Sequence, residues 1–226
     1  FWVSQQIDVS LNHSDKKIKT NADEIVALMT PIIKSFFTDI GMEITNDAIQ
    51  VFGGYGYTKD QGIEQLFRDN RITPIYEGTN SVQAIDLVYR KILNNNIFDR
   101  YIAQLSNEVK EFAKDEKLTL FADKFFKYLE LLNNFTLWLN EKNKSSKDDV
   151  SSACNDYLKV LGYVALAHSW LKILKVSHLK LNENKTFFED KINTAKYYFD
   201  KILPRVQSHY LSAVTGSDTM MKSNFN

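Results

Sequence analysis

The 226-residue sequence predicts an all-α protein, and three observations support this fold class. Apolar residues recur every three to four positions along most of the chain, as they do on the buried face of a helix. No segment alternates apolar and polar residues convincingly, as a half-buried strand would. Between the glycine-rich stretch over residues 50–79 and Gly162, the chain has no glycine. We therefore expect a helical bundle followed by an additional four-helix-like domain.

The first long helix of the expected bundle is predicted from its cap and its apolar spacing. An opening helix should end near Asn12, and residues 13–20 form a polar connection. Asn21 and Glu24 have the spacing of a capping box, in which each side chain binds a free backbone amide of the other residue. Pro31 should kink or interrupt the helix that follows. The expected buried stripe of this helix consists of Ile25, Leu28, Met29, Ile32, Ile33, Phe36, Phe37, Ile40, Ile44, Ile49 and Phe52.

Residues 50–79 break the regular pattern, because they hold five of the eight glycines and one of the three prolines. Gly53 and Gly54 should end the long helix, since glycine tolerates the left-handed conformation of a C-terminal cap. A loop to Gly62 and a short helix over residues 63–72 are expected next. Pro74 disfavours helical geometry in the preceding residue, so the segment TPIYEG should be extended or turned.

A further helix should begin at Thr79 or at Asn80, in the latter case with Gln83 as the capping-box partner. It should run to the asparagine cluster at residues 94–96, where the character of the sequence changes. Four helical patterns follow, and a solvated link over residues 140–149 separates the second pattern from the third. The four patterns start at Phe98, Leu118, Val150 and Phe188, and the last extends to Val206. We expect two domains, over residues 1–95 and 97–226.

Composition narrows the class of partner. Lysine and arginine number 28, as do aspartate and glutamate, so no net charge favours nucleic acid or an anionic membrane. No run approaches the roughly 20 apolar residues of a transmembrane helix, so no transmembrane segment is expected. The single cysteine, Cys154, fits a reducing, cytoplasmic location. Because Phe1 already lies within a helical pattern, we expect the chain to be part of a longer protein.

Glu77 is the carboxylate with the most distinctive surroundings, since it lies between Tyr76 and Gly78 just before a predicted helix. A confined, partly dry site would raise the pKa of this carboxyl and make it a useful base near neutral pH. The alternative is a loop glutamate that ends in water or caps the following helix. The residues alone leave both open.

The other candidate features point to structure more than to chemistry. The segment FGGYG lacks the dinucleotide-binding spacing and follows a helix, so it is either a helix cap or a bare backbone that phosphates can approach. Arg68, Asp69 and Arg71 should form ion pairs on a helix surface. The four histidines do not have metal-ligand spacing, and no residue beside Cys154 would activate it as a nucleophile, so no metal is expected.

Taken together, QVFGGYGYTKDQGIEQLFRDNRITPIYEGTN resembles the signature near the end of the acyl-CoA dehydrogenase family. The shared pattern is Q-x-F-G-G-x-G-Y, then E-x-x-x-R-D, then I-Y-E-G-T. Further resemblance covers LMTPIIKSFFTDIG upstream, and VQAIDLVYRKIL, DYLKVLGYVALAHSWLKIL and TGSDTMM downstream. These flanking segments are similar to the larger bacterial members that carry an extra C-terminal helical domain, among them the 3-methylmercaptopropionyl-CoA dehydrogenases.

The resemblance implies a cytoplasmic FAD flavoprotein of fatty acid metabolism that oxidises the α,β bond of an acyl-CoA thioester. Glu77 matches the base that removes the α proton, and the backbone at Glu77 and Gly78 would hold the thioester carbonyl, with Tyr76 also in the substrate-binding group. Gln50, Gly53 and Gly54 match residues that contact the adenosine and pyrophosphate part of FAD, often from a neighbouring subunit. Thr79 matches a residue at the flavin site, and Asn80 belongs to the same cofactor-binding group. A homodimer or tetramer and an electron-transfer flavoprotein or similar acceptor are implied as well.

Two departures from the family pattern limit what this chain should do by itself. Ser81 occupies a position where the family often has glutamine. The helical and β domains that precede this part in family members are absent from these residues, so the chain alone is expected to be inactive. A non-catalytic helical assembly module and an acyl-CoA oxidase remain as alternatives.

Overall fold

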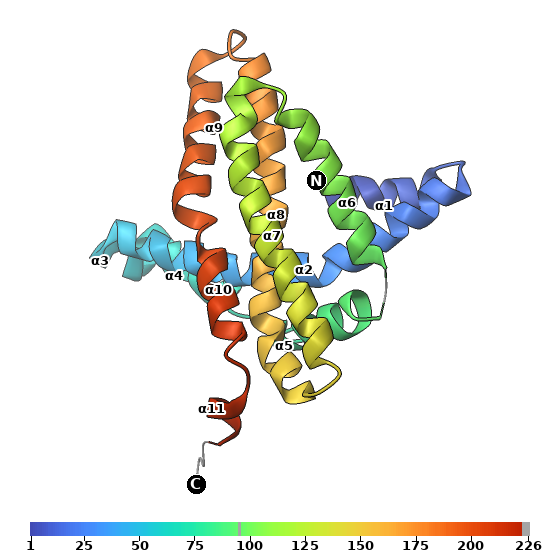
Figure 1. The fold of residues 1–226 in the computed structure, drawn as a ribbon. Coiled ribbons are helices and arrows are strands. Elements are labelled where there is room, and N and C mark those ends of the chain that lie inside the picture. Colours follow the sequence, from blue (N-terminus) through green and yellow to red (C-terminus); the bar gives the residue numbers. More distant parts are fainter. Residues whose placement is uncertain (95, 223–226) are drawn as a thin grey trace. The chain divides into compact units, whose positions relative to one another are not determined.

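The computed structural model describes residues 1–94 and 96–222, and within those ranges it contains helices and turns without a strand (Figure 1). The predicted all-α class is therefore confirmed. The chain divides into two compact units, Phe1–Lys91 and Ile92–Asn226. Asn95, the last residue of the first predicted domain, lies outside the described residues, as do the last four residues of the second.

The first unit is organised around one helix of 37 residues, α2. The four other α-helices of the unit, α1, α3, α4 and α5, each contact it. The elements of the unit are α1 (Trp2–Asn12), α2 (Lys16–Phe52), α3 (Gly54–Tyr57), the 3₁₀ turn η1 (Lys59–Gln61), α4 (Ile63–Asn70) and α5 (Asn80–Ile85). The π-helix η2 (Asp86–Ile92) continues α5 to the boundary of the unit.

The N-terminus of α2 corrects the predicted cap. Asp15 is the N-cap residue, and its carboxylate accepts hydrogen bonds from the backbone amides of Lys17 (2.7 Å) and Ile18 (3.2 Å). Asn21 and Glu24 lie within the helix, so they do not form a cap at its start. Aspartate at the earlier position satisfies orphan amides in the same way, so the cap lies at Asp15 instead of Asn21, about 1.7 turns earlier. The helix also runs without interruption through Pro31.

The predicted apolar stripe of α2 is buried over only part of the helix. Ile25, Leu28, Ile32 and Phe36 are buried, whereas side chains beyond Phe36 are half-buried or exposed. Among the exposed apolar residues are Phe37, Ile44, Val51 and Phe52. By length and composition α2 could also cross a membrane, contrary to the expectation from the sequence. The buried positions and the polar contacts at its centre described below are those of a helix packed within a protein.

The glycine-rich stretch is more helical than predicted. Gly53 ends α2 as expected, with φ 61° and ψ −142°. In place of the expected loop to Gly62, the chain forms the single turns α3 and η1. At Gly56 a side chain would come 2.7 Å from the carbonyl oxygen of Ile49, so this glycine allows the turn to pack against the end of α2.

The second unit is a bundle around α8, a 33-residue helix that contacts four other helices (Figure 1). Its apolar residues face more than one side, as expected of a helix surrounded by others. The elements are α6 (Ile97–Phe112), α7 (Glu116–Lys142), α8 (Lys147–Leu179), α9 (Lys185–Tyr197), the π-helix η3 (Tyr198–Ile202), α10 (Arg205–Ala213) and α11 (Asp218–Met221). The helices contacting α8 are α6, α7, α9 and α10.

Two sequence expectations for this unit need correction. The predicted link over residues 140–149 is shorter, because α7 continues to Lys142 and α8 begins at Lys147. The fourth helical pattern is divided into α9, η3 and α10. The division falls at Pro204, which has no backbone N–H to continue the helix, and the turn before it widens so that the Leu203 amide donates to the Tyr198 carbonyl (2.8 Å).

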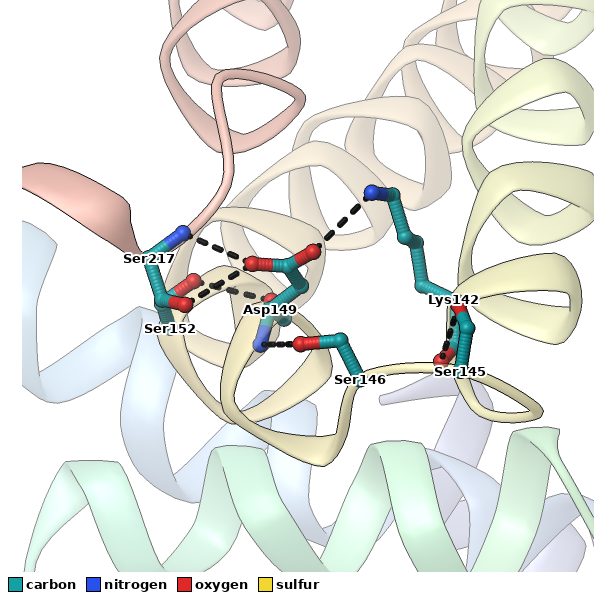
Figure 2. Close-up of polar contacts among 6 residues, drawn as sticks. All are labelled: Lys142, Ser145, Ser146, Asp149, Ser152 and Ser217. Atoms are coloured by element: carbon teal, nitrogen blue, oxygen red, sulfur yellow. Dashed lines mark hydrogen bonds and ion pairs between the residues drawn. The ribbon is translucent and has the colours of Figure 1, made fainter.

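Figure 2 shows a group of polar contacts, which we call the Asp149 clasp, that joins the start of α8 to the end of α7 and to the residue before α11. The Asp149 carboxylate, in the first turn of α8, accepts hydrogen bonds from the backbone amide (2.9 Å) and the hydroxyl (2.8 Å) of Ser217, and it pairs with Lys142 (3.0 Å). The Ser217 amide, followed by Lys142, holds the pKa of Asp149 well below its usual range. Gly216, at φ 79°, allows the close approach, because a Cβ there would lie 2.9 Å from the carboxylate.

Candidate functional site

The segment that carries Glu77 is a turn between α4 and α5, tied down at both ends. At its start, the Thr73 hydroxyl donates to the carbonyl (2.8 Å) and the side-chain oxygen (3.0 Å) of Asn70, the last residue of α4. At its end, the Asn80 amide donates to the Pro74 carbonyl (3.3 Å), so the chain folds back on itself. The prediction of a turned TPIYEG segment is confirmed, and α5 begins at Asn80 with Thr79 as its N-cap.

Glu77 has an unusual backbone conformation. Its φ is 54°, which makes it the one residue other than glycine with a positive φ among the described positions. Such a conformation costs an L-residue on the order of 1 kcal/mol or more, so the surrounding contacts must hold it in place. Gly78 follows at φ 85°, where glycine meets no such penalty. Side chains in strained turns of this kind are often functional.

The side chain of Glu77 is exposed, which matches the alternative of a loop glutamate that ends in water; the described residues do not form the confined, partly dry site of the other alternative. Tyr76 is also about half exposed. The described residues of this chain therefore present the carboxylate but do not enclose it. Burial of this group would require atoms from outside this chain, such as a bound ligand or another part of the protein.

Asn80 connects the turn to the centre of α2. Its side-chain nitrogen donates to the Asp39 carboxylate (2.7 Å), to the Thr38 hydroxyl (3.1 Å) and to the Ser35 carbonyl (3.2 Å). Its side-chain oxygen accepts from the ammonium of Lys34 (2.9 Å). Because this amide is fully used within the chain, Asn80 positions the turn. The FAD contact expected of Asn80 stays a prediction.

Lys34 makes a second contact with the turn, and Gln83 makes a third. They hold the two consecutive carbonyls that follow the Glu77 Cα. The Lys34 ammonium donates to the Gly78 carbonyl at 2.6 Å. The Gln83 side-chain nitrogen donates to the Glu77 carbonyl at 3.0 Å. Gln83 was expected to cap Asn80, and this role was wrong, because Thr79 is the N-cap and Gln83 folds back to the turn instead.

Several polar groups in the turn remain available to a ligand. The backbone amides of Glu77, Gly78 and Thr79 have no hydrogen-bond partner in the part of the chain that the structure describes. Within the same ranges, the Thr79 hydroxyl makes no cap bond and no other hydrogen bond. Adjacent amides of this kind can donate to a carbonyl oxygen or to an anion.

The other candidate group, Gln50, Gly53 and Gly54, lies at the C-terminal end of α2, and all three residues are exposed. A side chain added at Gly53 or Gly54 would meet no atom of the chain within 4 Å. Gly53 has a positive φ that explains a glycine, but Gly54 has neither a positive φ nor a crowding neighbour. The backbone at Gly54 is thus open to a group from outside the chain, and the residues present fit the expected approach of a cofactor phosphate.

The two groups are separated along α2. Asn80 is bound at Asp39, whereas Gly53 follows the end of the helix fourteen residues later. At about 1.5 Å of rise per residue, this amounts to roughly 20 Å along the helix axis. The residues predicted from one continuous sequence motif therefore form two sites on one helix.

The remaining sequence candidates have structural surroundings. Asp69 accepts a hydrogen bond from Gln65 (2.6 Å), and within the described ranges it forms no ion pair with Arg68 or Arg71, so that expectation was wrong. Burial raises the pKa of the Cys154 thiol to about 12, which makes it inert as a nucleophile. No group of three or more histidine, cysteine or acidic side chains in the described residues could hold a metal ion.

Sequence reasoning missed Lys34, Thr38 and Asp39. They are more than forty residues from Asn80 in the chain, and they join it only because the turn packs on α2. One sequence signal was available, since these polar residues interrupt the apolar spacing of α2 between Ile33 and Ile40. A polar side of a long helix is usually solvated, so the signal carried no function by itself.

Comparison with known protein families agrees with the two-unit division. Residues 13–93 match the family described as "Acyl-CoA dehydrogenase, C-terminal domain". Residues 105–224 match "Acetyl-CoA dehydrogenase C-terminal like". This chain belongs to the acyl-CoA dehydrogenase family and corresponds to its C-terminal portion.

Curated relatives show how much of a whole protein the chain represents. Butyryl-CoA dehydrogenase of Syntrophomonas wolfei is 25% identical over 206 residues, which cover 88% of this chain and 34% of the relative. The 3-methylmercaptopropionyl-CoA dehydrogenase of Ruegeria pomeroyi is 36% identical over 83 residues, or 37% of this chain and 14% of that protein. The chain thus spans about a third or less of the length of these relatives.

Solved structures share the fold. One is the acyl-CoA dehydrogenase from Bacillus anthracis, solved in complex with FAD, with a TM-score of 0.70 at 15% identity. The match spans 96% of this chain and 39% of the B. anthracis chain. ACDH-11 of Caenorhabditis elegans, solved with C11-CoA, also has a TM-score of 0.70, at 18% identity. That match spans 99% of this chain and 37% of the ACDH-11 chain. At these identities the likeness establishes the fold alone.

Proposed function

We propose that this chain is the base-bearing C-terminal portion of an FAD-dependent acyl-CoA dehydrogenase, in which Glu77 removes the α proton of an acyl-CoA thioester. The observation that carries the proposal is the held left-handed conformation of Glu77 at the family position of the base, beside unpaired backbone amides. A loop glutamate that only capped a helix would not need this conformation, and here Thr79 is the N-cap.

The proposed chemistry uses the carboxylate and the amides in complementary roles. Glu77 takes the proton from the α carbon, and the Cα–H electron pair moves toward the thioester carbonyl before it forms the α,β double bond. The amides of Glu77 and Gly78 are placed to donate to that carbonyl oxygen as it gains negative charge. When bound, FAD supplies the acceptor for the hydride that leaves the β carbon.

The cofactor would be held at two places, one at the C-terminal end of α2 and one in the turn before α5. The open backbone at Gly54, with Gln50 and Gly53, supports binding of the adenosine and pyrophosphate end, and the Thr79 hydroxyl supports a contact near the flavin. The separation of the two groups along α2 favours their use by the two ends of an extended cofactor or by cofactors in two copies of a homo-oligomer. An electron-transfer flavoprotein would reoxidise the enzyme, in a cytoplasmic setting.

The experiment is a Glu77→Gln substitution in the complete protein. Loss of a general base typically costs on the order of 10²–10⁴ in rate, so acyl-CoA should no longer bleach the flavin at a measurable rate while FAD stays bound. Glu130→Gln, which removes an exposed carboxylate on α7, is the matched control and should bleach normally. Normal bleaching by the Glu77→Gln protein would sink the assignment, and peroxide release during turnover would identify an oxidase instead.

A further inference from the structure

We infer that Lys34 is a positioning residue for Glu77: its ammonium holds the Gly78 carbonyl and the Asn80 side-chain oxygen, and thereby keeps Glu77 in the left-handed conformation. We call these two hydrogen bonds, of 2.6 Å and 2.9 Å, the Lys34 clamp. The inference deepens the proposed function and rests on it for its catalytic consequence.

The turn has few internal contacts that could maintain this conformation. The amides of three consecutive residues, Glu77 to Thr79, are unpaired in the described ranges. Before Glu77, the amides of Ile75 (2.9 Å) and Tyr76 (3.1 Å) both donate to the Ile72 carbonyl. From Glu77 onward, the contacts within the turn and α5 are the Asn80 amide to Pro74 and the Gln83 side chain to the Glu77 carbonyl. Since a glutamate does not adopt a positive φ without outside support, a contact from a rigid element is needed.

Lys34 provides that contact from the centre of α2. Its side chain is half-buried, and a charged donor forms a stronger hydrogen bond to a carbonyl than a neutral one does. The bound carbonyl belongs to Gly78, the residue directly after Glu77, so the clamp fixes the peptide plane that follows Gly78. Gln83 holds the preceding peptide plane, between Glu77 and Gly78, so the two contacts together restrain the backbone that leaves Glu77.

Asn80 links the clamp to the rest of α2 in a defined orientation. An ammonium cannot accept a hydrogen bond and a carboxylate cannot donate one, so the side-chain oxygen of Asn80 must face Lys34 and its nitrogen must face Asp39. The amide thus lies between a positive and a negative group, and either one would oppose its rotation. Neither charged group contacts the Glu77 side chain, so Lys34 and Asp39 act by fixing the position of the turn.

Loss of the clamp should misplace the carboxylate without removing it. Displacement of a catalytic group by about 1 Å can cost roughly 10²-fold in rate. In the complete enzyme, Lys34→Met should therefore lower kcat by about 10- to 100-fold while KM changes by less than about threefold. FAD content should stay at the wild-type level.

The control uses another lysine of α2, and the rescue uses Asn80 and its partner Asp39. Lys17→Met removes an exposed lysine near the start of α2 and should leave kcat unchanged. Asn80→Asp would place a carboxylate against Asp39 and should lower kcat. Adding Asp39→Asn to Asn80→Asp restores a carboxylate–amide pair with opposite polarity, keeps an acceptor for Lys34, and should recover part of the loss.

Hydrogen exchange provides a readout that does not depend on turnover. In Lys34→Met, a peptide covering residues 72–80 should exchange faster than in wild type, while peptides from α8 remain unchanged. Wild-type kcat together with wild-type exchange in that peptide would overturn the inference. Faster exchange throughout the Lys34→Met protein would also count against the inference. So would a loss of kcat in Asn80→Asp that is not partly recovered when Asp39→Asn is added.

The double variant separates this inference from the proposed function. If Glu77 is the base, adding Lys34→Met to Glu77→Gln should cause no further loss of rate, because there is no base left to position. If Glu77→Gln is fully active, the proposed function fails, while the exchange measurement still tests the clamp. If Glu77→Gln is inactive and Lys34→Met is fully active, the clamp alone fails.

Discussion

The long helices α2 and α8 have similar lengths and similar apolar spacing, but they are buried differently. The buried residues of α8 extend from Val150 to Ser177, almost its full length. Those of α2 extend from Ala22 to Phe36, and the sixteen residues from Phe37 to Phe52 contain none. Within its own unit α8 contacts four other helices, including the 27-residue α7, whereas the other α-helices of the first unit have 4 to 11 residues.

This difference shows that apolar spacing predicts which side of a helix can be buried, but burial itself depends on what packs there. The Lys34 clamp lies where the buried part of α2 ends, since Phe36 is buried and Phe37 is about half exposed. The candidate site is therefore at the border between a packed and an unpacked half of the same helix.

The largest expected difference in stability is between substitutions in the two halves of α2. Ile32 is 2% exposed and Ile44 is 62% exposed, so the two isoleucines form a matched pair. Ile32→Ala should lower the free energy of unfolding by about 2–5 kcal/mol. Ile44→Ala should change it by less than about 0.5 kcal/mol. Urea unfolding measures both values, and equal losses would show that the second half of α2 is covered after all.

The matched test on α8 uses one leucine from its first half and one from its second half. Leu158 and Leu174 are both buried, with exposed fractions of 1% and 0%. Each change to alanine should therefore cost about 2–5 kcal/mol. A cost at one end only would mean that α8 resembles α2 more than its buried residues indicate.

A smaller effect should come from His168, a buried ionisable residue of α8. Its ring nitrogen lies 2.9 Å from the Glu108 carboxylate, which also pairs with Lys172 (3.1 Å). Burial, with help from Lys172, lowers the pKa of His168 to about 4, against the opposing effect of Glu108. The unfolded chain then binds a proton near pH 6.5 that the folded protein does not bind until about pH 4. Stability is retained above pH 6.5 and falls as the pH drops through this window.

His168→Gln should remove this part of the pH dependence. We expect the difference in unfolding free energy between pH 7 and pH 4.5 to shrink by on the order of 1–3 kcal/mol relative to wild type. Urea titrations at the two pH values measure it. An unchanged difference would show that His168 is protonated with Glu108 in the folded state.

A smaller effect than that of His168 is expected at the Asp149 clasp. Asp149→Asn keeps the shape but weakens the contacts to Ser217 and Lys142, at a cost of about 1 kcal/mol near neutral pH. Because the pKa of Asp149 is lowered on folding, its contribution is present above about pH 4 and is lost as the pH falls further. The variant and the wild type should converge in stability at low pH, as measured by thermal unfolding. Ser152→Ala, which removes a hydroxyl bound to the backbone of Asp149, is the control and should not alter this pH dependence.

The sequence was sufficient to predict most helices of the fold, since their apolar spacing and caps are local properties. It placed Gly53 at the end of α2 and Thr79 among the possible starts of α5 correctly. It misplaced the start of α2, because Asp15 and Asn21 are both good caps and only the packed structure distinguishes them.

The candidate site was only partly predictable. Glu77 was found because a glycine-rich turn carries it, but its conformation and exposure depend on contacts with α2. Lys34 could not be paired with Asn80 from the sequence, because 46 positions separate them and no local pattern connects two polar residues at that distance. The separation of Gly54 from the Glu77 turn likewise follows from the packing of the turn near Asp39, fourteen residues before Gly53, which the adjacency of the motif in the sequence does not reveal.

The left-handed conformation of Glu77 has a consequence for how position 77 can evolve. At φ 54° the backbone favours glycine or asparagine, whereas the proposed chemistry requires a carboxylate. Selection for stability alone would therefore tend to replace this glutamate, and selection for catalysis must act against that tendency. A lineage that lost its activity should lose Glu77 early while it keeps Gly78, whose own backbone still needs glycine.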